Sequence, residues 1–303
     1  MGLVAPSVTD AGGAPVVSVL VTVFNRESFL PACLDSILAS TFDDFEVVVV
    51  DDLSTDDSYE VALRYAARDK RISVHRNDRN LGDYPNRMRA AAIARGTYLK
   101  YVDSDDVIYP TSLAIMVAAM DANWRAALGM SHSLPEDEKP YPWFLEPAES
   151  WRKEFLGDGC LGSGPTGAIL RRAAFLDAGG FHDWGVLSDT ELWYRMSARW
   201  PVVLLPPGLV WWRRHEQQEF SRDDAATTYL EKGFALTMHA LSLHECPLTE
   251  TERQRARERA RQHHARRLLS LALLRRRPAL ALRLMRRGGL TGAEMLQGFR
   301  SYR

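Results

Sequence analysis

Two aspartates one residue apart, Asp103 and Asp105, are the side chains whose spacing points most directly to chemistry. They follow an apolar segment, 97–102, that is expected to form a strand. Carboxylate oxygens in this pattern suit a hard divalent cation, Mg²⁺ or Mn²⁺, that keeps few protein ligands and shares the oxygens of a diphosphate. The alternative is a solvated acidic turn that caps the helix expected after Pro110. Taken alone, the D-x-D pattern favours the turn.

A second acidic pair, Asp51 and Asp52, follows the β-branched segment 45–50. Carboxylates only accept hydrogen bonds, so this pair suits a base N–H and a ribose hydroxyl. The alternative is that they cap the helix expected to begin near Asp56. Arg87, on a helix expected over 85–94, is either a bidentate donor to phosphates or a surface arginine of that helix.

Asp189 and His215 are further candidates, each with a structural alternative. Asp189 lies at the start of a helix predicted over 188–198, so its carboxylate points out at the mouth of the helix. There it is either a general base or an N-cap that accepts backbone N–H groups, and the residues alone favour the cap. His215 follows a tryptophan-rich strand and is either a ligand of the metal or diphosphate or an ordinary loop residue.

Strand-like and helix-like periods alternate along the first hundred residues and must position these groups. Strands are expected over 16–24, 45–50, 71–75 and 97–102, with helices over 27–39, 56–68 and 85–94. This alternation predicts a mostly parallel sheet wrapped by helices. In such sheets the ligand site lies beyond the carboxyl ends of the strands, which gathers Asn25 and Arg26 with both acidic pairs.

The second half of the chain is less regular and then wholly helical. Frequent Pro, Gly and Trp over 124–165 predict loops and short strands, and the glycine-rich part, 157–165, lacks both the lysine of a P-loop and a G-x-G-x-x-G pattern. We expect residues 157–165 to form a mobile loop near a bound substrate. Strands are expected over 166–171, 202–205 and 209–212, followed by helices over 225–243, 249–274 and 278–287 that form a bundle or hairpin.

Composition excludes several classes of protein. With 303 residues, 46% hydrophobic and 25% charged, the chain is not disordered, collagen-like or a coiled coil. Its longest apolar runs are far short of the roughly 18 residues of a membrane span, and residues 1–15 are expected to be a flexible tail and not a signal peptide. Three widely spaced cysteines argue against a disulfide framework or a cysteine zinc site and fit a reducing cytoplasm.

The small net charge of −1 conceals a strongly basic C-terminal segment. Residues 251–287 contain thirteen arginines and two glutamates, a formal charge of +11, so the remainder carries −12. Three interpretations are open: a solvated helical face, association with an anionic membrane surface through leucines that alternate with the arginines, and nucleic-acid binding. The last is least favoured, because no motif that reads nucleic acid is present.

Four short segments follow one another along the chain in an order that is typical of a known protein family. They are VSVLVTVFNR (17–26), VDDLSTD (50–56), NLG (80–82) with a downstream arginine, and YVDSDD (101–106). This series resembles family-2 glycosyltransferases. GGF (179–181), SDTELW (188–193) and RRH (213–215) resemble later elements of that family, and the resemblance reaches Ser221. Thr22, Leu53 and Ser188 depart from it, standing where the family usually has Pro, Gly and the first acid of an ED pair.

The resemblance implies a GT-A fold and the transfer, with inversion, of a sugar from a nucleotide-sugar donor to an acceptor hydroxyl. It implies Asp189 as general base and a divalent cation, Mn²⁺ or Mg²⁺, on Asp103, Asp105 and His215. The implied substrate-binding residues are Thr22, Phe24, Asn25, Arg26, Asp51, Asp52, Asn80, Gly82, Arg87, Asp103, Ser104, Glu191, Trp193 and Arg213. A UDP-sugar is the default donor, and the acceptor is a carbohydrate, a lipid-linked hydroxyl or another hydroxyl compound.

The predicted organisation is a flexible tail (1–15), a GT-A domain (16–221) and a basic helical region (222–303). Within the domain, 16–110 forms the nucleotide-sugar half and 111–221 the acceptor half. The fold class is α/β, a Rossmann-like, mostly parallel sheet flanked by helices, with an all-helical C-terminal extension. We expect a cytoplasmic protein, with peripheral association at the inner face of the membrane left open.

Two rival functions remain open. The first is a non-catalytic nucleotide-sugar-binding or membrane-associated scaffold, which the serine at position 188 keeps open. The second is a sugar-phosphate nucleotidyltransferase. It is less favoured because the chain lacks a glycine-rich N-terminal loop with Arg and Lys to hold a triphosphate.

Overall fold

The computed structural model describes residues 13–131, 139–216, 218 and 225–300. Two compact units divide the chain. The first unit comprises residues up to 150, 160–184 and 188–213, and the second comprises 151–159, 185–187 and the residues from 214 onward. Most of the predicted N-terminal tail and the predicted domain boundary at residue 221 lie outside the described residues.

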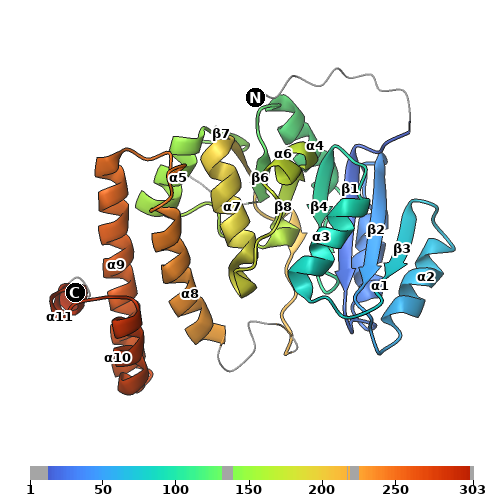
Figure 1. The fold of residues 1–303 in the computed structure, drawn as a ribbon. Helices are drawn as coiled ribbons and strands as arrows, with labels where there is room; N and C mark the ends of the chain where they lie inside the picture. Colours follow the sequence, from blue (N-terminus) through green and yellow to red (C-terminus); the bar gives the residue numbers. More distant parts are fainter. Residues whose placement is uncertain (1–12, 132–138, 217, 219–224, 301–303) are drawn as a thin grey trace. The chain divides into compact units, whose positions relative to one another are not determined.

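An eight-stranded sheet forms the centre of the first unit (Figure 1). Its strand order is β3-β2-β1-β4-β8-β6-β9-β7. The strands are β1 (Val17–Val23), β2 (Phe45–Asp51), β3 (Ile72–Arg76), β4 (Tyr98–Tyr101), β6 (Leu128–Ser131), β7 (Trp143–Leu145), β8 (Ala168–Arg171) and β9 (Val202–Leu205). Neighbouring strands from β3 to β4 are parallel, whereas β8 and β7 run antiparallel to their neighbours. The predicted mostly parallel sheet is therefore confirmed.

The first two strands are apolar along nearly their whole length because both faces of the sheet are covered. Val17, Val19, Leu20 and Val21 have no exposed surface, and the valines of β2 are equally buried. Strands buried on both faces need continuous rather than alternating hydrophobic residues. Their register pairs the last residue of β1, Val23, with Asp51, so the loops that follow β1 and β2 begin side by side.

Helices flank this sheet, and most match the predicted segments. In the first unit they are α1 (Leu30–Leu38), α2 (Ser58–Ala66), α3 (Asp83–Ile93), α4 (Ser112–Ala122), α6 (Arg172–Asp177) and α7 (Ser188–Arg199), with a short 3₁₀ turn η1 (Pro165–Gly167). A two-stranded antiparallel ribbon joins β5 (Val107–Ile108) to β10 (Val210–Trp211). The expectation of loops and short strands over 124–165 was wrong in part, because α5 (Pro147–Leu156) lies there.

The second unit is built mainly from helices at the C-terminal end of the chain. They are α8 (Ala225–Ala240), α9 (Glu250–Leu273), α10 (Pro278–Arg287) and α11 (Gly292–Arg300), with a short 3₁₀ turn η2 (Gly185–Leu187) earlier in the chain. Thr249 and Glu252 form a reciprocal capping box that starts α9. α8, α9 and α10 confirm the predicted helices, whereas α11 was not predicted. Among the described residues, none of the helices combines the length and the hydropathy that a membrane span requires.

Candidate active site

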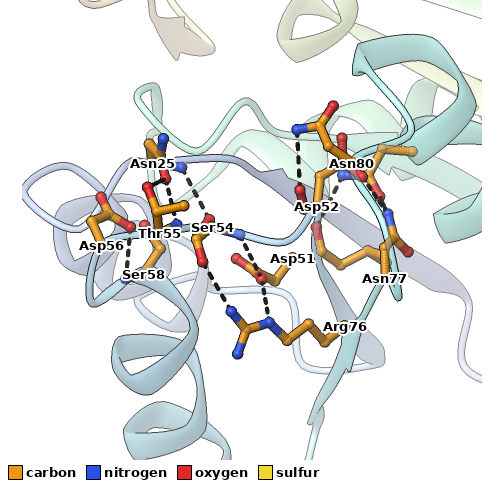
Figure 2. A network of polar contacts seen from close by, with 12 residues as sticks. Asn25, Asp51, Asp52, Ser54, Thr55, Asp56, Ser58, Arg76, Asn77 and Asn80 are labelled. Atoms are coloured by element: carbon orange, nitrogen blue, oxygen red, sulfur yellow. Dashed lines mark hydrogen bonds and ion pairs between the residues drawn. The ribbon is translucent and has the colours of Figure 1, made fainter.

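The loops after β1, β2 and β4 meet at one edge of the sheet, as the sequence predicts. The side chain of Arg26, after β1, donates from Nε to Oδ2 of Asp105, after β4, at 3.1 Å. The backbone N–H of Asn25 donates to Oγ of Ser54 at 3.0 Å, which joins the β1 loop to the β2 loop (Figure 2). Three separate strand ends therefore contribute to a single polar cluster.

Asn25 shapes the loop after β1 through an unusual backbone conformation. Its φ of 53° lies in the left-handed region, which asparagine tolerates better than most residues. In that conformation its Oδ1 accepts hydrogen bonds from the backbone N–H of Thr55 at 2.8 Å and from the hydroxyl of Thr55 at 3.3 Å. The amide thus ties the loop after β1 to the loop that precedes α2 (Figure 2).

Asp51 and Asp52 both turn into the protein. Asp51 has no exposed surface, and its Oδ2 pairs with Nε of Arg76 at 3.2 Å and accepts the backbone N–H of Ser54 at 3.1 Å. Asp52 is 2% exposed and accepts the backbone N–H groups of Leu81 at 2.8 Å and Gly82 at 2.9 Å. Both carboxylates therefore fix loops in the described conformation, and contact with a nucleoside stays a prediction.

The Asn80–Gly82 turn is held by Asp52 from one side and by its own asparagine from the other. Nδ2 of Asn80 donates to the carbonyl of Asp52 at 3.2 Å, and Oδ1 of Asn80 accepts the N–H of Gly82 at 3.1 Å. Gly82 has φ 86° and ends the turn where α3 begins. Only glycine adopts this conformation without steric cost, which explains its position in the motif.

Arg87 is a buried member of the cluster, so the alternative of a surface arginine was wrong. The residue is 7% exposed, and its guanidinium pairs with Oδ1 of Asp103 and with Oδ1 of Asp83, both at 2.8 Å. The rings of Tyr84 and Tyr101 lie 5.7 and 5.8 Å from the guanidinium carbon. Burial opposes the charge of Arg87, but the two aspartates raise its pKa well above the usual value.

Asp103 and Asp105 lie side by side in the D-x-D loop, and each faces an arginine. The Asp103 side chain is 27% exposed and pairs with Arg87, while the Asp105 side chain is 14% exposed and pairs with Arg26. Burial raises the pKa of Asp103, and Arg87 opposes that rise. Nε of Arg213 donates to the backbone carbonyl of Asp105 at 2.8 Å, so the late arginine also contacts this loop.

The remaining residues implied for the donor differ in their exposure. Phe24 is 45% exposed and follows Thr22, which is half-buried near the end of β1. Ser104, between the two aspartates, is 6% exposed. Phe24 is therefore the residue of this group that presents an apolar surface to solvent.

Residues that the sequence did not single out support the D-x-D loop from within the protein. Lys100 in β4 is fully buried and donates from Nζ to the carbonyls of Thr166 and Tyr101. Burial lowers its pKa to about 7, although Asp103 and Asp106 oppose that shift. Oγ1 of Thr166 in turn accepts the backbone N–H of Asp103 at 3.0 Å. A lysine inside an otherwise apolar strand was the available signal.

Asp106 completes the support of this loop. It is 1% exposed, and its Oδ1 accepts the backbone N–H of Arg213 at 3.1 Å. Burial, followed by the charge of Asp103, raises its pKa to about 7. The backbone carbonyl of Asp103 accepts a weak hydrogen bond from the buried thiol of Cys33 at 3.6 Å.

Asp189 lies in the same electrostatic environment as the D-x-D loop. It is half-buried at the start of α7, where its Oδ1 accepts the backbone N–H of Thr190 at 2.6 Å. The N–H of Asp189 donates to the hydroxyl oxygen of Tyr84 at 3.3 Å. Burial raises the pKa of Asp189 to about 6, while Arg87 lowers it and Asp103 raises it. At neutral pH this carboxyl is ionised, yet it is a stronger base than an ordinary aspartate.

Glu191 performs a structural task in the described conformation. Its Oε2 pairs with Nη2 of Arg195 at 2.7 Å, and its Oε1 lies 3.3 Å from Nδ1 of His182. Arg195 also donates to the carbonyls of Ala178 and Gly180, which anchors the glycine turn before α7. Binding of an acceptor by Glu191 stays a prediction.

Trp193 belongs to the core of the first unit. Its side chain has no exposed surface, its Nε1 donates to the carbonyl of Ser163 at 2.9 Å, and its ring meets Phe181 edge-on at 6.5 Å. In this conformation no face of the indole is open to a sugar, so Trp193 supports the 163 loop by packing.

His215 belongs to the second unit, whereas Asp103 and Asp105 belong to the first. Within the second unit, the backbone N–H of His215 donates to the side-chain oxygen of Gln218 at 3.2 Å. Its role as a metal ligand stays a prediction. Ser221, the last residue of the predicted resemblance, lies outside the described residues.

Comparison with known protein families decides the classification. The sequence model of glycosyl transferase family 2 matches residues 18–178, more than half of the chain. The chain belongs to this family. Membership confirms the predicted family and, with it, the glycosyltransferase class of enzyme.

Relatives of this family 2 glycosyltransferase include a protein of similar extent and several partial matches. Protein MT1568 of Mycobacterium tuberculosis is 30% identical over 226 residues, covering 67% of this chain and 68% of that protein. The PGL/p-HBAD biosynthesis glycosyltransferase of Mycobacterium bovis is 38% identical over 107 residues, covering 35% of this chain and 41% of that protein. The glycosyltransferase EpsJ of Bacillus subtilis is 42% identical over 95 residues, covering 31% of this chain. That match spans 27% of the length of EpsJ.

Solved structures show the same fold. Staphylococcus aureus TarS 1–349 in complex with UDP-GlcNAc aligns with a TM-score of 0.64 at 21% identity, covering 85% of this chain and 75% of that chain. Mannosyltransferase PcManGT from Pyrobaculum calidifontis, in complex with GDP-Man and Mn²⁺, aligns with a TM-score of 0.61 at 18% identity, covering 94% and 86%. These likenesses confirm the predicted fold class of the family 2 glycosyltransferase.

The D-x-D residues of this glycosyltransferase fit a cation that is shared with a substrate. No group of three or more His, Cys, Asp or Glu side chains is arranged to hold a metal ion within the described residues. Asp103 and Asp105 supply two partly exposed carboxylates, each balanced by an arginine. Two carboxylates suit Mg²⁺ or Mn²⁺ when phosphate oxygens and water complete the coordination shell.

Proposed function

We propose that this glycosyltransferase moves a sugar from a nucleoside-diphosphate donor to an acceptor hydroxyl with inversion at the anomeric carbon. One observation carries the proposal. The loops after β1 and β4 meet through the Arg26–Asp105 ion pair, Arg87 of α3 pairs with Asp103, and Asp189 lies in the field of the same Arg87 and Asp103. A phosphate-binding cluster and a tuned base are thereby coupled within one unit.

The donor end would bind the diphosphate through paired charges. Arg26, Arg87 and Arg213 all contact the D-x-D loop, and guanidinium groups bind phosphate oxygens with bidentate geometry. A divalent cation, Mn²⁺ or Mg²⁺, held by Asp103 and Asp105 would offset the negative charge that develops on the leaving diphosphate. The loops fixed by Asp51 and Asp52 would supply the nucleoside pocket.

Asp189 would act as the general base. Its pKa of about 6 leaves it ionised at neutral pH and basic enough to take the proton of the acceptor hydroxyl. As that proton moves to the carboxylate, the hydroxyl oxygen forms a bond to the anomeric carbon. The bond from this carbon to the diphosphate oxygen breaks at the same time. Attack from the side opposite the leaving group inverts the configuration.

The substrates are proposed by class. Neighbouring folds were solved with UDP-GlcNAc and with GDP-Man and Mn²⁺, which supports a nucleoside-diphosphate sugar and a divalent cation. A UDP-sugar is our default donor, with the hydroxyl of a carbohydrate or lipid-linked compound as acceptor. Both are expected to be used in the cytoplasm.

A non-catalytic nucleotide-sugar-binding protein is the second candidate. Ser188 stands where the family usually has an acid, and it is fully buried with its Oγ accepting the backbone N–H of Trp184 at 3.0 Å. This serine has a structural task in closing the turn before α7. Asp189 is therefore the remaining acidic candidate of the ED pair.

Release of nucleoside diphosphate from a panel of UDP- and GDP-sugars separates the two candidates. The wild type should release diphosphate above background, and Asp189→Asn should not. Asp177→Asn is the matched control, because Asp177 is a surface carboxylate whose side chain is 61% exposed. Equal background release by the wild type and Asp189→Asn would support the non-catalytic candidate.

A thermal-shift measurement tests the donor site separately from catalysis. UDP or GDP should raise Tm more with Mn²⁺ than without it, since a ligand that binds only the folded state stabilises that state. Asp105→Asn should lose the increment due to Mn²⁺, measured relative to its own Tm without ligand, which loss of the Arg26 pair should lower. A nucleotide shift that is the same with and without Mn²⁺ would contradict the proposed cation.

A further inference from the structure

The junction of α9 and α10 in the second unit exposes leucines beside arginines. We call residues 273–279 the α9–α10 corner; every one of them is exposed. Leu274 is 71% exposed, the largest exposure among the large hydrophobic residues of the described chain, and Leu273 is 62% exposed. α9 and α10 meet at this junction in Figure 1.

Positive charge surrounds these leucines without acidic neighbours in the sequence. Arg275, Arg276 and Arg277 follow Leu274 directly, and no Asp or Glu occurs between Glu258 and Glu294. Some arginines elsewhere in the unit are paired with acidic residues, as in the Arg261–Glu294 and Arg287–Glu231 contacts. Within the described part of the chain, the three corner arginines form no ion pair or side-chain hydrogen bond.

A small hollow of about 120 Å³ lies between α8 and α9, next to the corner. Its polar lining consists of the side chains of Thr227, Arg267, Ser270 and Arg275. Partial burial, followed by the positive charge of Arg275, lowers the pKa of Arg267, so the two guanidinium groups repel each other. Two arginines and two hydroxyls around one hollow match the oxygens of a phosphate group.

We propose that the α9–α10 corner docks the protein on an anionic lipid surface. Leu273 and Leu274 would enter the boundary between headgroups and acyl chains, while Arg275 and its neighbours bind lipid phosphates. Exposed leucines flanked by arginines bind such surfaces through apolar burial and charge attraction together. A nucleic acid would use the arginines but would leave the leucines exposed to water, so the lipid surface is favoured. The proposal does not depend on glycosyl transfer.

Sedimentation with vesicles tests this docking on the full chain. Vesicles of phosphatidylcholine with 30% phosphatidylglycerol, a composition of roughly physiological anionic content, should bind the protein, and pure phosphatidylcholine should not. Each arginine near an anionic surface contributes about 1 kcal/mol, roughly fivefold in partitioning. Arg275→Glu with Arg277→Glu should therefore weaken binding by more than tenfold. Arg64→Glu with Arg255→Glu is the control of equal charge, because both residues are exposed and lie outside the corner.

A leucine pair tests insertion as opposed to charge alone. Leu273→Ser with Leu274→Ser should weaken binding by at least tenfold, whereas Leu63→Ser with Leu176→Ser should not. The control leucines are 43% and 49% exposed and lie on α2 and α6. Circular dichroism should show that all four variants remain folded.

Several outcomes would overturn the docking proposal. The first is that the wild type does not bind anionic vesicles at low salt. The second is that the corner and control charge variants lose vesicle binding equally. The third is that Leu273→Ser with Leu274→Ser binds as well as the wild type. Binding to a random DNA duplex that depends on Arg275 and Arg277, without binding to vesicles, would instead assign the corner to nucleic acid. Because donor hydrolysis needs no vesicle, its result distinguishes failure of docking from failure of the proposed enzyme.

Discussion

The strongest test of the proposed mechanism is the pH dependence of transfer in Asp189→Asn and in the wild type. Burial raises the pKa of Asp189 to about 6, so the base is about 97% ionised at pH 7.5 and about 9% ionised at pH 5. The kcat/KM of the wild type should therefore fall about tenfold between pH 7.5 and pH 5. Below pH 6 it should approach a tenfold loss per pH unit.

Replacement of the base should cost far more than this titration. A positioned general base contributes about 10²–10⁴-fold, so Asp189→Asn should lower kcat by that factor, or about 2.7–5.5 kcal/mol in the barrier. The limb near pH 6 should also disappear from its profile. Asp106, whose pKa is raised to about 7, and Lys100, whose pKa is lowered to about 7, also titrate in this range. A limb that persists in the variant therefore belongs to Asp106, Lys100 or another group.

The thermal stability of Asp189→Asn provides an internal control, because this substitution should lower kcat without lowering Tm. Because the folded state raises the pKa of Asp189, its carboxylate is held at a cost above pH 6, and that cost falls as the pH drops toward 4. Asp189→Asn should thus have a Tm at pH 7.5 equal to or above that of the wild type. The mechanism would be refuted by a folded Asp189→Asn enzyme that keeps more than a tenth of wild-type kcat, or whose pH profile is unchanged.

Three further predictions concern the loops around the donor. Gly82→Ala should lower the free energy of unfolding by about 1–2 kcal/mol in chemical denaturation, because an alanine is strained at a φ of 86°. The cost is backbone strain and not a clash, since the added Cβ would meet no atom within 4 Å. Thr166→Val should cost about 1–3 kcal/mol and lower kcat, since the N–H of Asp103 loses its acceptor, and Thr166→Ser should restore both. Arg87→Gln should lower the free energy of unfolding by at most about 3–5 kcal/mol, and by less to the extent that solvent screens the partly exposed Asp103. The same variant should lose the rise in Tm that a bound nucleotide causes. A native Tm for Arg87→Gln would show that the pair is not structural.

Much of the fold followed from the sequence because its signals are local. Continuous apolar strands such as 45–50, alternating with amphipathic helices, allow few arrangements other than a parallel sheet covered on both faces. The capping residues before α9 and the proline at the start of α10 likewise mark those helices. α5, α6 and α11 were missed. Frequent Pro, Gly and Trp obscured the helical period of the 124–165 segment that contains α5.

The composition of the candidate site was also accessible from the sequence, whereas the task of each side chain was not. The strand ends gathered Asp52 and Asp103 at one edge of the sheet, and the family resemblance assigned Arg87 and Asp189 to the same site. Only tertiary packing decided that Asp52 holds the Asn80–Gly82 turn and that Arg87 is buried against Asp103. It also placed the wholly buried Lys100 beneath the D-x-D loop.

The sequence could predict the place of each side chain but not its task, for a physical reason. Residue types and spacing determine which strand end a side chain follows, because the period of a strand or helix is local. Burial, ion pairing and pKa depend on atoms contributed by segments far apart in the chain. Thr166, for example, lies 63 residues from the Asp103 backbone N–H that it accepts. The raised pKa of Asp189 arises in the same way, from burial and from Arg87 and Asp103 on other elements. Tertiary structure alone brings those atoms together.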